Sequence, residues 1–191
     1  MPRFPPRALV GLAVVLLAGC GNERTPVPDV ATPADPAGTR PIDLEDAGVF
    51  FTGPGNWDDG DARGALAGGV QSGRATVAVW RYPRTEPLPI TRAQLTRVRD
   101  LLVERVRQRD PTFEPEASRV TRRAGEPAIE LLGQQTIEGR RVKVRSAHVF
   151  AGGAEIVVDA YAPPADFDRL DPTVFLPALG SLRLRAPGTP R

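Results

Sequence analysis

"GEPAIELLGQQTIEGRRVKVRSAHVFAGGAEIVVDAYA", residues 125–162, is the part of the chain that says most about its fold. It contains three apolar segments rich in β-branched residues, 128–137, 140–151 and 154–162, which are separated by "EG" and "GG". Strand-like segments joined by such glycine-containing dipeptides are typical of β-hairpins. A fourth strand-like segment, 118–124, lies just before "GEP". The sequence therefore predicts a meander of four antiparallel strands.

A two-residue turn at Glu138-Gly139 would fix the register of the central hairpin. The expected opposed pairs are Val142 with Gln135, Val144 with Gly133, and His148 with Ile129. Because successive side chains of a strand alternate between its faces, Arg141, Lys143 and Arg145 share the opposite face and are expected to point to solvent. Arg119 and Arg123 on a neighbouring strand could extend this row.

On the N-terminal side of the meander, the segments Val49–Phe51, Ala65–Val70 and Arg74–Tyr82 also have strand character. Between the strand groups, apolar residues recur at helical spacing from Leu95 to Val106, with charged residues interleaved. Thr91 followed by Gln94 forms a candidate capping box, and Asp110-Pro111 ends the helix. After residue 164 we expect a short helix, a break at Pro172, a second helix ending near Gly180 and a last strand.

This order predicts an α+β fold, in which a curved antiparallel β-sheet carries one long helix and short C-terminal helices. The layout resembles the PsbP/Mog-like fold, and within it the LpqN-like and DcrB-like bacterial lipoproteins. The resemblance rests on "VFFTGPGNW", "TRAQLTRVRDLLVERV", "GEPAIELLG" and "FLPALGSLRL", and it covers nearly all of residues 48–186. It implies accessory and protein-binding modules rather than enzymes, and it supplies no functional motif whose residues could be matched.

The N-terminus has the features of a bacterial lipoprotein leader. Arg3 and Arg7 precede an apolar run, 8–17, which is too short to cross a bilayer because a spanning helix needs about 20 apolar residues. The run ends in "LAGC", residues 17–20, which looks like a lipobox, so we expect cleavage before Cys20 and lipidation of its thiol. An ordinary secretory signal with a cysteine at its cleavage site is the alternative. Two or more acyl chains would give stable membrane anchoring.

Four regions are expected along the chain: a signal peptide, 1–19; a lipidated Cys20 and proline-rich tether, 20–41; one α+β domain, 42–186; and a tail, 187–191. The tether has few large apolar residues and should remain extended. Removing residues 1–19 takes away two arginines and no acid, which leaves 23 basic and 23 acidic side chains. A chain without net positive charge gives no support to a nucleic-acid partner.

The sequence contains no recognisable catalytic, metal or nucleotide motif. His148 is the single histidine, and a lone histidine on an apolar strand face is expected to be a hydrogen-bonded core residue. Asp58, Asp59 and Asp61 lie in the loop "WDDGD" but lack the further ligands of a calcium loop, and a solvated turn is favoured. "GALAGG" matches no phosphate-binding loop. We therefore expect no metal and no cofactor.

These observations predict an extracytoplasmic lipoprotein, anchored to a bacterial membrane through Cys20, that binds a partner and catalyses no reaction. The first hypothesis is a protein-interaction module of the cell envelope. Its candidate surface is the row Arg141, Lys143 and Arg145, which could meet an acidic partner or anionic lipid, or could simply keep an open sheet face soluble. The alternative is a carrier that holds a small molecule or lipid between the sheet and the long helix. An enzyme with a carboxylate-only or substrate-assisted site is the third hypothesis.

Overall fold

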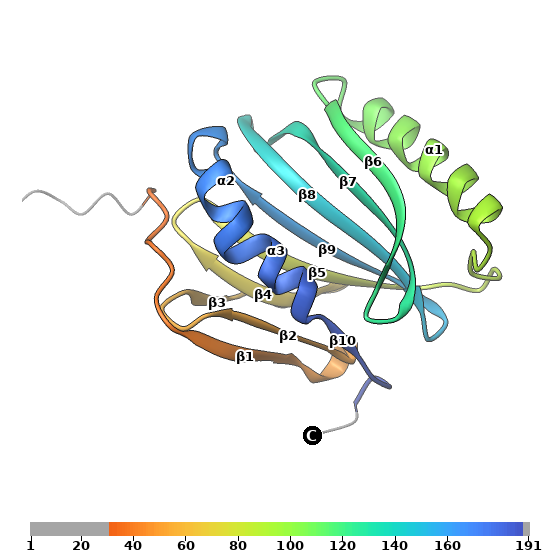
Figure 1. Cartoon of the computed structure of the whole chain (residues 1–191), viewed down its shortest axis with the longest axis horizontal. Helices are drawn as coiled ribbons and strands as arrows, with labels where there is room; N and C mark the ends of the chain where they lie inside the picture. The colour runs from red at the N-terminus through yellow and green to blue at the C-terminus, as the bar shows by residue number, and fades with distance from the viewer. Residues whose placement is uncertain (1–30, 189–191) are drawn as a thin grey trace, which may run out of the picture.

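The computed structural model describes residues 31–188, which form one α+β domain (Figure 1). The predicted signal peptide, Cys20 and the first half of the predicted tether lie outside the described residues. Seven antiparallel strands make up the main sheet in the order β3-β4-β5-β9-β8-β7-β6. Their bounds are Asp58–Gly60 (β3), Leu66–Ser72 (β4), Ala75–Pro83 (β5), Glu114–Arg123 (β6), Glu126–Ile137 (β7), Arg140–Ala151 (β8) and Ala154–Ala162 (β9). The predicted fold class is confirmed.

The central hairpin has the predicted register. Gln135 lies opposite Val142, Gly133 opposite Val144, and Ile129 opposite His148. Glu138 and Gly139 both adopt positive φ angles, 50° and 74°, as a two-residue turn between strands with a right-handed twist requires. The preceding turn was expected at Gly125-Glu126-Pro127 but is formed by Ala124 and Gly125, because the next strand already begins at Glu126.

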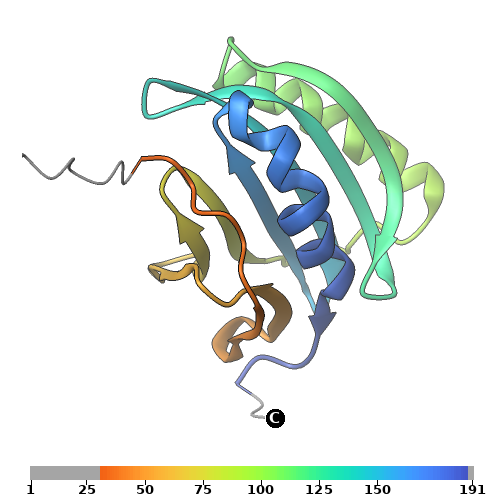
Figure 2. The same ribbon diagram turned by 60° about the vertical axis from the view of Figure 1, so that its left-hand side comes forward.

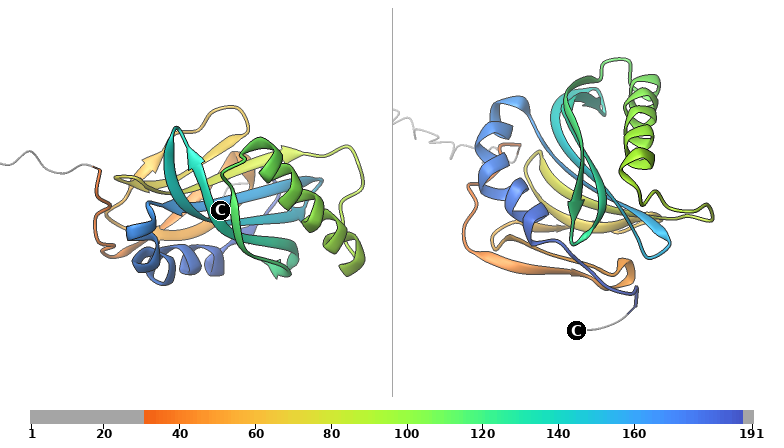
Figure 3. Two further views of the ribbon diagram at one scale, coloured as in Figure 1. Left: turned by 90° about the horizontal axis from the view of Figure 1, so that it is seen from above. Right: turned by 45° about the vertical axis from the view of Figure 1, so that its right-hand side comes forward.

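Helix α1, Arg92–Arg109, packs on β6 and β7 on one face of the sheet (Figure 3). Its predicted capping box is present: Gln94 N–H donates to Thr91 Oγ1 at 3.2 Å, and Thr91 N–H donates to Gln94 Oε1 at 3.0 Å. The inner side of α1 places Leu95 against Ile129, Leu131 and Phe150 of the sheet. No helix among residues 31–188 is long and apolar enough to cross a membrane.

The C-terminal helical segment lies on the other face of the sheet (Figures 2 and 3). It runs from α2, Pro164–Leu170, through a π-helical turn, Asp171–Phe175, into α3, Leu176–Ser181. The predicted break at Pro172 is wrong. Proline lacks a backbone N–H and normally interrupts the hydrogen bonds of an α-helix, but here a π turn starting at Asp171 accommodates it, and the helical path continues.

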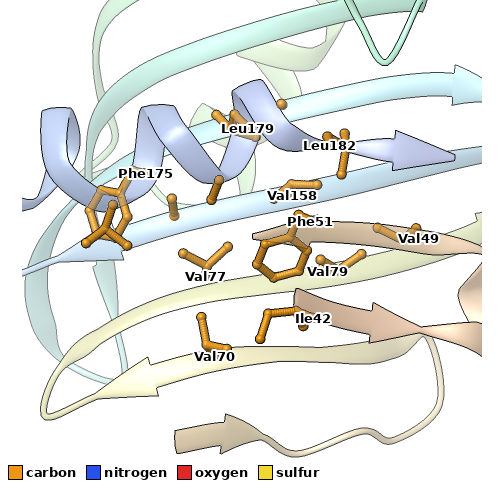
Figure 4. Close-up of a cluster of buried hydrophobic side chains, with 14 of the residues drawn as sticks. Ile42, Val49, Phe51, Val70, Val77, Val79, Val158, Phe175, Leu179 and Leu182 are labelled. Carbon is orange, nitrogen blue, oxygen red and sulfur yellow. The ribbon is translucent and has the colours of Figure 1, made fainter. Parts of the chain in front are cut away.

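A second, three-stranded sheet lies beside the C-terminal segment, in the order β1-β2-β10. Its strands are Thr39–Leu44 (β1), Val49–Pro54 (β2) and Arg183–Leu184 (β10), and a short 3-10 turn, Glu45–Ala47, joins the first two. The main core lies between this sheet, the main sheet and the C-terminal helices (Figure 4). Its members include Ile42, Val49, Phe51, Val70, Val77, Val79, Val158, Phe175, Leu179 and Leu182.

The folded domain reaches further toward the N-terminus than the expected boundary at residue 42. Strand β1 already begins at Thr39. Ahead of it, Ala34 N–H donates to Ser72 Oγ at 3.0 Å, and Ala37 N–H donates to Asn56 Oδ1 at 2.8 Å. Hydrogen bonds from backbone N–H groups to side chains of the domain therefore hold part of the proline-rich segment in place, which shortens the predicted tether.

Candidate functional site

The predicted basic row does not form an open cationic surface. Arg145 makes two 2.7 Å hydrogen bonds to Asp171 of the C-terminal segment, and its side chain is 13% exposed. Lys143 lies 3.2 Å from both Glu116 and Asp168. The expectation that this face points to solvent is wrong for these two residues, because the C-terminal helices pack across it. The alternation along the strand correctly placed Arg141, Lys143 and Arg145 on one face of the sheet, but it could not show that the helices cover this face.

The remaining basic residues of this face are also paired. Arg141 forms a 2.5 Å salt bridge to Glu114. Arg119 and Arg123 both bind Glu130, a buried carboxylate on β7. Each positive charge in the row thus has a carboxylate partner within the domain. Such an arrangement ties strands and helices together and leaves little uncompensated charge to attract an acidic partner.

The opposite face of the main sheet carries a cavity of about 560 Å³ beside α1. Drug-sized ligands generally occupy clefts of roughly 300–1,000 Å³, so this cavity is large enough for one. Its floor is formed by β5, β7, β8 and β9, and one wall is formed by α1. The apolar and aromatic lining consists of Trp80, Tyr82, Leu102, Val106, Phe113, Leu131, Ile137, Val144, Val157 and Tyr161.

Polar side chains converge on the floor of this cavity. His148 Nδ1 lies 2.7 Å from Glu155 Oε1, and His148 Nε2 lies 3.2 Å from Ser146 Oγ. Ser146 donates a hydrogen bond to Asp159, and Arg84 forms a salt bridge with Glu155. Alternation along β8 and β9 brings these residues to one face, because Ser146 lies opposite Asp159 across the two strands.

The cavity perturbs the ionisation of both acids. Burial alone would raise the pKa of Glu155, but hydrogen bonds from His148 and Arg84 outweigh it and lower this pKa to about 2. Burial raises the pKa of Asp159 above its usual value despite the hydrogen bond from Ser146. Burial and the charges of Asp159 and Glu155 also raise the pKa of the Tyr82 phenol. Two acids of one cavity whose pKa values are shifted in opposite directions mark this cavity as a candidate functional site.

Ser146, His148 and Glu155 are spaced like a nucleophile, a base and an orienting acid. Acyl transfer also needs donors, usually backbone N–H groups, that stabilise the oxyanion. Ser146 lies in the middle of β8, paired with Leu131 on one side and Asp159 on the other, so the sheet ladder occupies the backbone around it. Its hydroxyl is also committed to Asp159. The cluster therefore has the character of a polar binding floor.

His148 is buried and hydrogen-bonded, as expected from the sequence. The sequence did not identify Ser146, Glu155 and Asp159 as site residues. Serines and acids are common in strands, and only the tertiary structure shows that these three lie together. Of the three aspartates in "WDDGD", Asp59 pairs with Arg40 at 2.5 Å. Within residues 31–188, no group of histidines, cysteines and acids is placed to hold a metal ion.

Solved structures share this architecture, although no family model and no curated protein matches the chain. Cyanobacterial PsbP (CyanoP) from Synechocystis sp. PCC 6803 is 14% identical with a TM-score of 0.60, over 79% of this chain and 95% of that one. PA94 of Pseudomonas aeruginosa, described as a putative regulator, is 18% identical with a TM-score of 0.51, over 77% and 97% of the two chains.

LpqN of Mycobacterium tuberculosis, described as involved in cell envelope biogenesis, is 13% identical with a TM-score of 0.51, over 77% of this chain and 90% of that one. At such identities the likeness concerns the arrangement of strands and helices and not the residues of a site. The resemblance expected from the sequence is confirmed at this level: the chain has a PsbP-like fold.

Proposed function

We propose that this protein is a lipid-anchored, extracytoplasmic binding protein that holds a small ligand in the cavity beside α1. The observation that carries the proposal is the cavity itself, in which an apolar and aromatic lining surrounds a few convergent polar groups with perturbed pKa values. This combination is what small-molecule sites generally have. A non-catalytic role agrees with the sheet ladder around Ser146, which occupies the backbone groups that an oxyanion would need.

The envelope location rests on the N-terminal sequence and on the structural likeness to LpqN. The "LAGC" motif supplies Cys20 as the lipid attachment site, and the proline-rich segment after it supplies a short spacer. Intact mass of protein from membrane fractions tests this part. A mature chain that begins at Cys20 with an added lipid mass, absent from Cys20→Ala, supports anchoring, whereas an unmodified chain released from the membrane argues against it.

A protein-interaction module remains the competing proposal. The surface suggested for it by the sequence, Arg141, Lys143 and Arg145, is engaged in salt bridges within the domain. The cavity on the other face is not filled by any described residue of the chain. The geometry therefore favours a ligand over a docked protein.

Native mass spectrometry of protein isolated from its own membranes tests ligand binding. We expect a bound mass on the wild type, and we expect Val157→Phe to lose it because the larger side chain projects into the cavity. Leu101→Phe is the matched control, since Leu101 is 57% exposed on α1 and does not line this cavity. A wild type without any bound mass, or equal retention by Val157→Phe, would count against the proposal.

A further inference from the structure

Two arginines of α1 reach the cavity without an ion-pair partner. Arg105 and Arg109 are four residues apart on the helix, so they lie on the same side of it, and both line the cavity. Within residues 31–188, neither forms a salt bridge or a hydrogen bond through its side chain. Arg84, the third arginine of the cavity, is bound to Glu155. The wall formed by α1 thus presents two guanidinium groups that no carboxylate contacts.

Within residues 31–188 the acids of the cavity form no salt bridge with this wall, although the charge of Arg109 acts on Asp159 and works to lower its pKa. Glu155 is already paired with both Arg84 and His148. Asp159 is held by Ser146, and burial disfavours its charged form. Even with Glu155 and Asp159 both ionised, the three arginines leave a surplus of positive charge. A ligand that adds a negative charge at Arg105 and Arg109 would remove the repulsion between these two like charges.

The helix itself explains only part of this arrangement. Arg109 lies in the last turn of α1, where a positive charge is favourable because of the helix dipole. Arg105 is one turn earlier and gains little from that effect. All three arginines are exposed, but Arg107, also in the last turn, does not line the cavity. The position of Arg105 and Arg109 over the cavity therefore suggests a role that Arg107 does not share.

The rest of the cavity is suited to an apolar body. The floor includes three aromatic residues from β5 and β9, which are Trp80, Tyr82 and Tyr161, and the apolar residues Leu131 and Val144. Aromatic side chains provide large apolar contact areas. The polar cluster of Ser146, His148 and Asp159 belongs to the same floor. A ligand with an apolar body and one terminal anionic group would match both kinds of surface.

We infer that the cavity takes an anionic amphiphile whose carboxylate or phosphate group is bound by Arg105 and Arg109 and whose apolar part lies over Trp80 and Val144. This inference rests on the proposed ligand-binding function and specifies its ligand class. Arginine suits such a role because its planar guanidinium group binds carboxylate or phosphate through two parallel hydrogen bonds. A fatty acid and an acidic lipid head group share this chemistry.

Fluorescence of Trp80 provides the test. The chain has two tryptophans, and Trp57 is buried in the main core, so a response to a cavity ligand arises from Trp80. The purified protein is titrated with three probes of equal chain length: decanoate, decyl phosphate and decanol. We expect both anions to bind more tightly than decanol, and a preference between decanoate and decyl phosphate distinguishes a fatty acid from a lipid phosphate.

The same titration on three variants locates the anion site. Losing one charged hydrogen-bonding partner should raise the decanoate Kd about tenfold in Arg105→Gln and in Arg109→Gln, whereas Arg107→Gln should match the wild type. Equal binding of decanol and decanoate, or equal loss in all three variants, would overturn the anionic class while leaving a cavity ligand in place. No response to any probe would contradict both the inference and the proposed function.

Discussion

Glu155 offers a quantitative test of the polar floor of the cavity. Its side chain is 9% exposed, and its carboxylate is held by Arg84 and His148, which lower its pKa from 4.5 to about 2. A carboxylate whose pKa is lower in the folded than in the unfolded chain stabilises the folded state at pH values above its unfolded pKa. This stabilisation is lost as the pH falls through the folded pKa. The relevant window is therefore between about pH 5 and pH 2.

The magnitude follows from the pKa shift. Each pKa unit corresponds to about 1.4 kcal/mol, so the interactions of Glu155 contribute about 3 kcal/mol to the free energy of unfolding near neutral pH. Nearly all of this should be lost by about pH 2. Glu155→Gln removes the titrating group, and the variant should therefore be about 3 kcal/mol less stable than the wild type at pH 6 but similar to it at pH 2.

Urea unfolding at a series of pH values measures this difference directly. The comparison between wild type and variant cancels the titration of the other acids, which both proteins share. Glu138→Gln is the control, because Glu138 lies exposed in the turn between β7 and β8 and should leave the pH profile unchanged. If Glu155→Gln and the wild type lose stability in parallel between pH 6 and pH 2, Arg84 and His148 do not stabilise the Glu155 carboxylate.

Further predictions concern packing, capping, the ion pairs and the second acid. Gly133→Ala should destabilise the domain by about 1–3 kcal/mol in urea unfolding, because its Cβ would lie 2.6 Å from the carbonyl oxygen of Glu114, whereas Gly180→Ala, which meets nothing within 4 Å, should not. Thr91→Ala should cost about 1 kcal/mol by removing the capping box, and should increase amide hydrogen exchange in the first turn of α1 but not in β8. Arg145→Gln leaves Asp171 without its partner and should lower the unfolding free energy by about 2 kcal/mol, a result contradicted if it behaves like the exposed Arg107→Gln. Because burial raises the pKa of Asp159, its contribution to the stability of the wild type should fall as the pH rises from 3.8 through that raised pKa, and Asp159→Asn should therefore gain stability relative to the wild type over this range in the same unfolding series.

The strands that the sequence predicted best are those whose turns have strong local signals. The register of β7 and β8 follows from the Glu138-Gly139 turn, since a two-residue loop leaves one way to pair the flanking residues. The extent of α1 follows from Thr91 and Gln94 at its start. The three-stranded sheet was not predicted, because β1 and β10 are far apart in sequence and β10 has only two residues.

The candidate site was predictable only in outline. The alternation of side chains along β8 placed Val142, Val144 and His148 on one face of the sheet. An amphipathic helix packed on that face suggested a cavity between the sheet and the helix. The sequence could not show that Glu155 and Asp159 contact His148 and Ser146, because those contacts depend on the pairing of β8 with β9. The packing of the C-terminal helices across Lys143 and Arg145 also depends on tertiary structure. These two residues, which were expected to be exposed, therefore form salt bridges to Asp168 and Asp171.

Amide chemical shifts would show whether a ligand occupies the cavity beside α1. Decanoate is titrated into the ¹⁵N-labelled protein, and the backbone amides that respond are mapped onto the strands and helices. We expect shifts concentrated in β8, β9 and the second half of α1, around Val144, Val157 and Arg105. Shifts confined to α2, α3 and the three-stranded sheet, or no shifts at all, would contradict a binding site in this cavity.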